Sequence, residues 1–297
     1  MNPSASSVTP RAQVLVHQLL AADHEVELTE TTRRGHATRL AERAAARGFD
    51  LVAVLGGDGT VNEGANGLVG SSTALAALPG GSTNVFCRTL GLPDDPVDAT
   101  AATVEALAAE RIRSVGVGSA NGRYFLFHSG VGYDAAVVEA VERRGELKRW
   151  LNHPLFAWAA ITTWISGYDR SQPHFRVCFD DEVVPDGYLT ICLNTDPYTF
   201  LGSRPFTLSP EAGLDSAFSV ITLRSLRVDK LLALVTRTLG SSGGLESGRD
   251  VSYRTDVSEL TIESDEPFPY QVDGDFLGRV RSLTFTHVAD GLRLVVP

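Results

Sequence analysis

The sequence predicts an α/β domain with a parallel sheet, followed by an antiparallel β-sandwich domain with helical inserts. Two observations lead to this prediction. In the first third of the chain, short apolar runs alternate with alanine-rich segments of helical periodicity, which is typical of a parallel sheet with helices. Beyond about residue 112, short β-rich runs follow one another closely, which is typical of antiparallel sheets. The predicted domains are residues 1–113 and 114–297.

The first domain is expected to alternate between helices and strands. Pro10 suits a first helical turn, and the alanines of residues 36–47 recur on one helical face. Helices are predicted at residues 9–22, 36–47, 60–68, 85–88 and 96–109, and strands at 25–31, 51–55 and 74–78. No apolar strand precedes the Asn2-Pro3 turn, so either the sheet lacks a first strand or the true start lies upstream.

The second domain is expected to be rich in short strands with turn residues between them. These strands are predicted at residues 124–129, 175–179, 188–194, 217–223, 260–263, 282–287 and 292–296. Two helical inserts are predicted at about 135–166 and 227–239.

Composition excludes several classes of protein. Of the 297 residues, 43% are apolar and 21% are charged, as in soluble globular proteins. The net charge of −10 argues against a nucleic-acid partner, because such binding depends on neutralising phosphates. Three cysteines without a C-x-x-C pair indicate neither a disulfide framework nor a zinc site.

The sequence also favours a cytoplasmic protein. Its first residues lack the apolar region of a signal peptide. The longest apolar stretch, residues 155–165, is shorter than the roughly 18–20 residues of a spanning helix. We therefore predict no transmembrane segment, although the protein could touch a membrane from one side.

Two glycine-rich loops follow consecutive predicted strands. Gly56-Gly57-Asp58-Gly59-Thr60 comes after residues 51–55, and Gly80-Gly81-Ser82-Thr83-Asn84 comes after residues 74–78. The carboxyl ends of parallel strands share one edge of a sheet, which is where open α/β sheets bind ligands. Backbone N–H groups and a helix N-terminus at such a loop suit a phosphate group.

The first loop is not a Walker motif, because that motif needs a lysine that reaches the terminal phosphates. The first lysine of this chain is Lys148. A bound nucleotide would have to be neutralised by backbone N–H groups, by Mg²⁺, or by arginines such as Arg33, Arg34 or Arg88.

The first loop, with Asn62 and Glu63 after it, resembles the signature of the diacylglycerol kinase catalytic-domain family, which includes bacterial lipid kinases and the sphingosine and ceramide kinases. Further segments resemble the family in order along nearly the whole chain. They are Asn2-Pro3, Thr31-Thr32 with Gly35-His36-Ala37, residues 79–88, Gly130-Val131-Gly132-Tyr133-Asp134, Pro210-Glu211-Ala212 with Asp215, and Asp273-Gly274-Asp275.

The resemblance implies an α/β nucleotide domain, as in diacylglycerol and NAD kinases, followed by a β-sandwich, with the active site between them. It implies transfer of the γ-phosphate of ATP to a lipid hydroxyl, with diacylglycerol as the expected acceptor, phosphatidic acid as the product, and a role in phospholipid biosynthesis. Mg²⁺ is the expected metal cofactor.

Specific site residues are expected on this basis. The implied catalytic residues are Asp273 as general base, Asp275 in support, and Asp58. The implied nucleotide-binding residues are Asn2, Thr31, Gly56, Gly57, Asp58, Gly59, Thr60, Glu63, Ser82, Thr83 and Asn84. Asp58 suits Mg²⁺, which prefers oxygen ligands, and Asp215 matches a family metal position.

Two of these residues keep an alternative interpretation. Glu63 either supports the site or caps its helix. Asp273-Gly274 is also a strong hairpin signal, and a turn that presents a carboxylate would satisfy both interpretations.

Departures from the family pattern leave alternatives open. Val85 stands where the family has Asp, and Ser216 stands where a second acid is common. The chain could therefore be a non-catalytic nucleotide- or lipid-binding protein with the kinase fold. A kinase of a sphingoid or soluble acceptor is another alternative, and a homodimer is one option for its assembly.

A basic, tryptophan-rich segment could contact the membrane or the lipid substrate. Arg143, Arg144, Lys148 and Arg149 lie beside Trp150, and the other tryptophans are Trp158 and Trp164. Basic residues next to tryptophans suit a membrane interface or a lid over a lipid site. The alternative is a core helix with one basic end.

Overall fold

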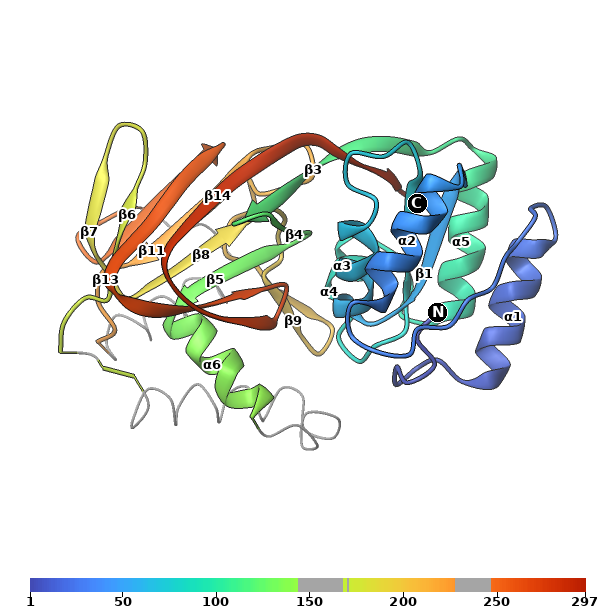
Figure 1. The fold of residues 1–297 in the computed structure, drawn as a ribbon, viewed down its shortest axis with the longest axis horizontal. Coiled ribbons are helices and arrows are strands. Elements are labelled where there is room, and N and C mark those ends of the chain that lie inside the picture. The colour runs from blue at the N-terminus through green and yellow to red at the C-terminus, as the bar shows by residue number, and fades with distance from the viewer. Residues whose placement is uncertain (144–167, 170, 228–246) are drawn as a thin grey trace. The chain divides into compact units, whose positions relative to one another are not determined.

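The computed structural model describes residues 1–143, 168–169, 171–227 and 247–297 (Figure 1). The described chain divides into two compact units. The first consists of residues 1–117 together with 289–297, and the second consists of residues 118–288. Residues 289–297, which the sequence pattern places in the second domain, belong to the first unit.

The first unit is a parallel α/β fold. Strands β1 and β2 pair in parallel from Leu51↔Ala74 to Gly56↔Pro79. The end of β14 joins them in parallel at Leu294↔Leu75. The elements of this unit are α1 (Pro10–Ala21), α2 (His36–Ala46), β1 (Leu51–Gly56), α3 (Asp58–Asn66), β2 (Ala74–Pro79), α4 (Val85–Thr89) and α5 (Pro96–Ala108). Strand β3 (Ile112–Ala120) leads into the second unit.

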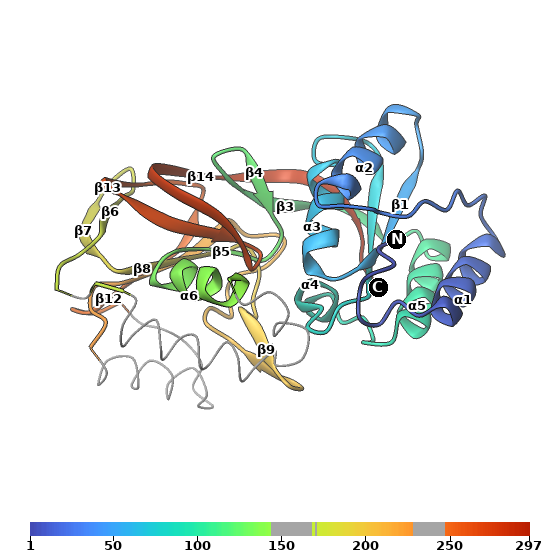
Figure 2. The ribbon, with the colours of Figure 1, turned by 60° about the horizontal axis from the view of Figure 1, so that its bottom comes forward.

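Local sequence determines where two of these helices begin. Thr9 accepts the N–H of Ala12 at the start of α1, and Asp95 accepts two N–H groups at the start of α5. Each cap is followed by proline at a first-turn position. Helices α1 and α5 pack side by side (Figure 2). A core cluster that includes Val16, Leu55 and Leu78 lies in this unit.

The strand predicted at residues 25–31 is not formed. This segment makes two backbone hydrogen bonds with Met1, whose N–H₃⁺ donates to the Thr29 carbonyl at 2.7 Å and whose carbonyl accepts from the Thr31 N–H at 2.8 Å. A single residue cannot provide the ladder of successive pairs that defines a strand. The alternating pattern of the segment was therefore misleading.

The second unit is built from antiparallel strands, as the sequence predicts (Figure 1). Its elements are β4 (Arg123–Phe125), β5 (His128–Gly132), α6 (Tyr133–Glu142), β6 (Phe175–Cys178), β7 (Val183–Gly187), β8 (Leu189–Leu193), β9 (Thr199–Leu201), β10 (Arg204–Phe206), β11 (Phe218–Leu223), β12 (Val251–Val257), β13 (Glu259–Val272) and β14 (Asp275–Val295). Neighbouring strands follow the order β14-β13-β5-β8-β11-β12.

An aromatic core fills this unit. Phe125 stacks on Phe218 with ring centroids 5.5 Å apart and meets Phe285 edge-on at 6.1 Å. All three side chains are fully buried. Helix α6 packs against β5, β8 and β13 (Figure 2). The core thus fixes the strands that carry the Asp273-Gly274 turn.

Several predicted elements differ in extent from the helices and strands of the structure. The strand predicted at 124–129 is split into β4 and β5 by residues 126 and 127. Helix α6 starts at Tyr133 and is described to Glu142, so the rest of the first predicted insert lies outside the described residues. The second insert and the basic, tryptophan-rich segment beyond Arg143 also lie outside them. Within the described ranges, no helix has the length and apolar character needed to cross a membrane.

Candidate functional site

The two glycine loops of the first unit pack directly against each other. The Gly80 N–H donates to the Gly56 carbonyl at 2.8 Å. A Cβ on Gly80 would lie 2.8 Å from the Gly56 Cα, and a Cβ on Gly81 would lie 2.8 Å from the Gly57 Cα. Real Cβ atoms are not found that close to backbone atoms, so this contact requires glycine.

Helix α3 begins within the first loop, where the Thr60 N–H donates to the Gly57 carbonyl at 2.9 Å. Gly57 is the N-cap and supplies no side chain, and Asp58 and Gly59 form the first turn. The first N–H groups of a helix lack partners inside the helix. With no side chain at Gly57 to compete, this helix N-terminus suits a phosphate group.

The carboxylate of Asp58 joins the two loops. Its Oδ2 accepts the Val85 N–H at 3.0 Å and its Oδ1 accepts the Phe86 N–H at 3.1 Å, so it holds the start of α4. Burial raises the pKa of Asp58, while these two hydrogen bonds act in the opposite direction. The observed role is structural, and the metal and catalytic roles of Asp58 stay predictions.

Asn84 closes the second loop. It adopts a left-handed conformation with φ of 47°. Its Oδ1 accepts the Gly81 N–H at 2.8 Å, and its Nδ2 donates to the Gly81 carbonyl at 3.0 Å. Ser82 and Thr83 lie between these residues, in the same loop. Val85, which replaces the family's Asp, contributes a backbone N–H to Asp58 and a buried side chain, so the replacement leaves this contact intact.

The N-terminal turn is held against the first loop. The Asn2 N–H donates to the Leu55 carbonyl at 2.9 Å, and its Nδ2 donates to Thr60 Oγ1 at 3.0 Å. Thr31 is joined to Met1, the neighbour of Asn2, through its N–H. The structure therefore brings Asn2, Thr31 and Thr60 into one chain of contacts beside Gly56.

Glu63 caps a helix other than its own. Its Oε1 accepts the Gly35 N–H at 2.6 Å and its Oε2 accepts the Ala37 N–H at 3.1 Å, at the start of α2. The alternative that Glu63 caps its own helix is wrong, because α3 has no side-chain cap hydrogen bond. Gly35 has no side chain with which to cap α2, and Glu63 supplies this function from 28 residues away.

Replacing Glu63 by alanine should lower the free energy of unfolding by about 1–2 kcal/mol, because two helix N–H groups lose a charged acceptor. Urea unfolding measures this change. Glu42→Ala, which removes an exposed carboxylate of α2, serves as the matched control and should change stability little. Equal stability of the two variants would contradict the capping role.

Asp273 lies at the tip of the β13–β14 hairpin in the second unit. Asp273 and Gly274 both have positive φ, 47° and 78°, between the paired residues Val272 and Asp275. This is the geometry of a two-residue hairpin turn that favours an Asp-Gly pair. The turn predicted from this dipeptide is confirmed, and the tip carries both predicted carboxylates.

The Asp273 carboxylate is buried among backbone N–H groups. Its Oδ2 accepts from Leu126 at 2.8 Å, and its Oδ1 accepts from Phe127 at 3.0 Å and from His128 at 3.1 Å. The residue is 6% exposed. These contacts also explain why the strand predicted at 124–129 is split, since these three N–H groups turn toward one carboxylate.

A second buried acid, Asp134, was not among the expected site residues. Tyr198 donates its hydroxyl to Asp134 Oδ1, and Gln271 donates its Nε2 to Asp134 Oδ2 at 2.9 Å. Burial raises the pKa of Asp134, and the two hydrogen bonds oppose this. The Gly-x-Gly-Tyr-Asp resemblance was the signal that could have identified it.

His128 lies beside this group. Its ring centroid is 4.3 Å from that of Tyr198, and its buried Nδ1 has no hydrogen-bond partner in the described part of the chain. Burial lowers the pKa of His128 to about 3. The histidine is therefore neutral in the folded protein near neutral pH.

Acidification should destabilise the protein through His128. The folded-state pKa lies below the unfolded value of about 6.5, so between these values only the unfolded state takes up the proton, and stability falls as pH drops below about 6.5. This group alone should remove about 1.4 kcal/mol between pH 7.5 and 5.5. Urea unfolding of the wild type and His128→Gln at both pH values measures the effect. If the stability of the two proteins changed identically with pH, the effect could not be assigned to His128.

The two predicted metal residues, Asp58 and Asp215, belong to different units of the chain. Asp215 is exposed in the second unit. Ser216, next to it, accepts the Gly213 N–H at 3.0 Å and closes a turn where the family commonly has an acid. No group of three or more His, Cys, Asp and Glu side chains that could hold a metal ion exists among the described residues.

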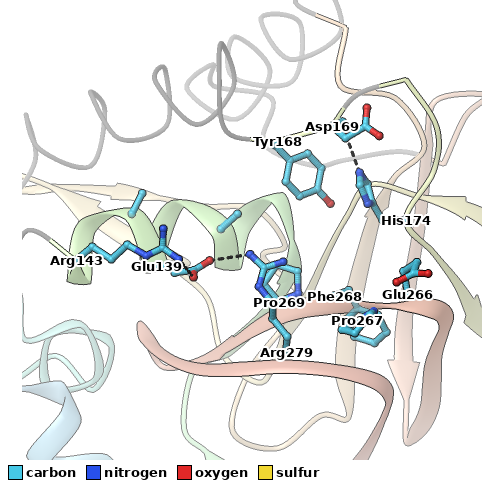
Figure 3. Close-up of a pocket in the computed structure, with 12 residues that line it drawn as sticks. Glu139, Arg143, Tyr168, Asp169, His174, Glu266, Pro267, Phe268, Pro269 and Arg279 are labelled. Atoms are coloured by element: carbon cyan, nitrogen blue, oxygen red, sulfur yellow. Dashed lines mark hydrogen bonds and ion pairs between the residues drawn. The ribbon is translucent and has the colours of Figure 1, made fainter.

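A pocket of about 350 Å³ opens in the second unit beside α6 (Figure 3). Glu139 forms ion pairs with Arg143 and, at 2.9 Å, with Arg279. Asp169, His174 and Glu266 also line the pocket, so both charge signs are present. None of the predicted catalytic or nucleotide-binding residues lines this pocket.

Comparison with known proteins decides the family. Residues 1–120 match the model of the diacylglycerol kinase catalytic domain. The diacylglycerol kinase of Bacillus subtilis (strain 168) is 41% identical over 292 residues, which cover 96% of this chain and 90% of the relative. The chain belongs to the diacylglycerol kinase family. Membership of this family supports the expectation of a lipid kinase.

Solved structures confirm the predicted fold class. A diacylglycerol kinase from Bacillus anthracis str. Sterne matches with a TM-score of 0.73 and 22% identity, over 100% of this chain and 94% of that one. An NAD kinase from Archaeoglobus fulgidus in complex with ATP matches with a TM-score of 0.53 and 11% identity, over 99% and 91% of the two chains. The diacylglycerol kinase family and the NAD kinases thus share this fold.

Proposed function

We propose that this diacylglycerol kinase family member transfers the γ-phosphate of ATP to a lipid hydroxyl, with diacylglycerol as acceptor and phosphatidic acid as product. The observation that carries the proposal is the contact between the Gly56-Gly57 and Gly80-Gly81 loops at the N-terminus of α3. A side chain at Gly57 or Gly81 would fill the space between the loops. Because these glycines have no side chain, their backbone can approach phosphate groups closely.

ATP is proposed as the phosphoryl donor. The B. subtilis relative is named a diacylglycerol kinase, and the A. fulgidus NAD kinase structure contains ATP. The N–H groups at the start of α3 would stabilise the charge on the phosphates, with Gly59 allowing close approach. Asn2, Thr60 and Asn84 would hold the loops around the nucleotide through their observed hydrogen bonds.

Mg²⁺ is proposed as the accompanying cation. When bound, it would supply positive charge to the transferred phosphate. Asp58 and Asp215 remain the proposed protein ligands. Mg²⁺ usually keeps several waters and takes only one or two carboxylates in addition to substrate phosphates, which suits a chain with no acidic cluster in its described residues.

Asp273 is proposed as the general base. It would accept the proton of the lipid hydroxyl while that oxygen bonds to the γ-phosphorus and the bond to the ADP oxygen breaks. The backbone N–H groups of residues 126–128 hold its carboxylate in place through three hydrogen bonds. Asp275 would support it from the same turn.

The lipid would be presented at a membrane surface. The segment proposed to contact the membrane lies, apart from Arg143, outside the described residues. Cytoplasmic location, a homodimer and a role in phospholipid biosynthesis stay predictions.

Phosphoryl transfer from radiolabelled ATP tests the proposal. The protein, Mg²⁺ and ATP are incubated with detergent micelles that contain diacylglycerol, ceramide or a sphingoid base, and with NAD as a soluble acceptor. We expect label in phosphatidic acid. Label only in another product would overturn the acceptor assignment, and ATP binding without transfer to any acceptor would favour a non-catalytic protein.

A further inference from the structure

A chain of hydrogen bonds connects Asp134 to the hairpin tip that carries the proposed base. Tyr198 donates to Asp134 Oδ1, and Asp134 Oδ2 accepts from Gln271 Nε2 at 2.9 Å. The Oε1 of the same Gln271 accepts the Gly274 N–H at 2.8 Å. Because the Gly274 N–H can only donate, Gln271 must turn its oxygen toward Gly274 and its nitrogen toward Asp134.

Gly130 has no side chain, and this leaves the space that the chain of hydrogen bonds occupies. A Cβ on Gly130 would lie 1.6 Å from Asp134 Oδ2 and 2.7 Å from Gln271 Nε2. Any side chain at position 130 would therefore displace the Asp134–Gln271 hydrogen bond. Gln271 is fully buried and Asp134 is 9% exposed, so water is a poor substitute for either partner.

The tip needs such support because its backbone is strained. Asp273 holds a positive φ, which costs a residue with a side chain free energy that its contacts must offset. Its carboxylate is anchored to residues 126–128, whereas the following peptide is anchored by Gln271. Loss of the second anchor would leave Gly274 able to rotate and would move both carboxylates of the tip.

We propose that Asp134 is a positioning residue that, through Gln271, holds the Asp273-Gly274-Asp275 turn in the conformation that phosphoryl transfer requires. This inference rests on the proposed function. Its burial and its hydrogen bonds to Tyr198 and Gln271 give Asp134 a positioning role, whereas the proton acceptor in the proposed reaction is Asp273.

Moving the negative charge from position 134 to position 271 tests whether Asp134 holds the turn through Gln271. In Asp134→Ala, the Gln271 N–H₂ loses its acceptor, and the Tyr198 hydroxyl loses its acceptor as well. The double variant Asp134→Asn with Gln271→Glu restores every bond. Its amide at position 134 donates to the new carboxylate at position 271, and that carboxylate also accepts the Gly274 N–H. Glu259→Gln, an exposed change on the same strand, is the matched control.

The single variant should lose roughly 10- to 100-fold in kcat with little change in the KM for ATP. The double variant should recover most of this loss. Hydrogen–deuterium exchange at the Gly274 amide should accelerate about tenfold or more in the single variant and slow again in the double variant. The control should match the wild type in all three measurements.

An unchanged kcat in folded Asp134→Ala, with only a lower melting temperature, would overturn the proposal, since Asp134 would then be merely structural. Failure of the double variant to restore slow exchange at Gly274 would overturn it as well. The exchange measurement needs no lipid substrate. A wild type that phosphorylates no lipid would refute the proposed function, whereas exchange would still decide whether Asp134 holds the turn.

Discussion

Alanine at position 81 is expected to abolish ATP binding at concentrations that saturate the wild type. Its Cβ would lie 2.8 Å from the Gly57 Cα, and a backbone atom cannot move aside as a side chain can. The two loops would have to separate, which would move the N-terminus of α3 away from the second loop. We expect the affinity for ATP to fall about 100-fold or more, and overpacking to cost about 1–3 kcal/mol of stability.

Calorimetric titration with ATP, together with thermal unfolding, measures both effects. Gly248→Ala is the matched control, because a Cβ there meets nothing within 4 Å and its φ is not positive. Gly81→Ala should lose affinity while it remains folded at the temperature of titration. Retention of wild-type affinity would show that the contact between the loops does not form the nucleotide site.

Asparagine at position 273 is expected to lower kcat about 10²- to 10⁴-fold, because the amide cannot accept the hydroxyl proton. A stability loss of about 1–3 kcal/mol should accompany this, since the amide nitrogen cannot accept an N–H from residues 126–128. The affinity for ATP should stay close to that of the wild type. A lower kcat together with an unchanged affinity for ATP distinguishes the loss of the base from unfolding of the protein.

Asp275→Asn is the comparison variant for this experiment. Asp275 lies two residues away in the same turn and has only a supporting role in the proposal, so its loss should reduce kcat less. Label transfer by both variants is measured on diacylglycerol micelles at a temperature where both are folded. Transfer that survives in Asp273→Asn but is lost in Asp275→Asn would assign the base to Asp275 instead.

The local architecture of the glycine loops could be predicted from sequence because its determinants lie close together in the chain. The apolar runs before Gly56 and Gly80 indicate consecutive strands, and parallel pairing then puts both loops at one sheet edge. The Asp273-Gly274 turn was predictable for the same reason, since a dipeptide specifies it.

The partners of the polar side chains could not be predicted. Asp58 caps a helix that begins 27 residues later, and Asp273 accepts N–H groups from 145 to 147 residues earlier. Periodicity indicates which face of an element is buried, but not which element lies opposite. The strand prediction for residues 25–31 failed for a related reason. The pattern fits a strand, but the backbone of this segment bonds to Met1 and pairs with no strand in the described part of the chain.

The last residues of β14 have a consequence for how the protein folds during synthesis. Leu294 pairs with Leu75 of β2, and Val295 packs with Ala76 and Ala106, so the first unit is completed only by residues made after the whole second unit. Domains generally fold in order as they leave the ribosome, N-terminal domain first. Here the first unit is completed only once Val295 has been made, and loss of residues 289–297 should affect the part of the protein made first.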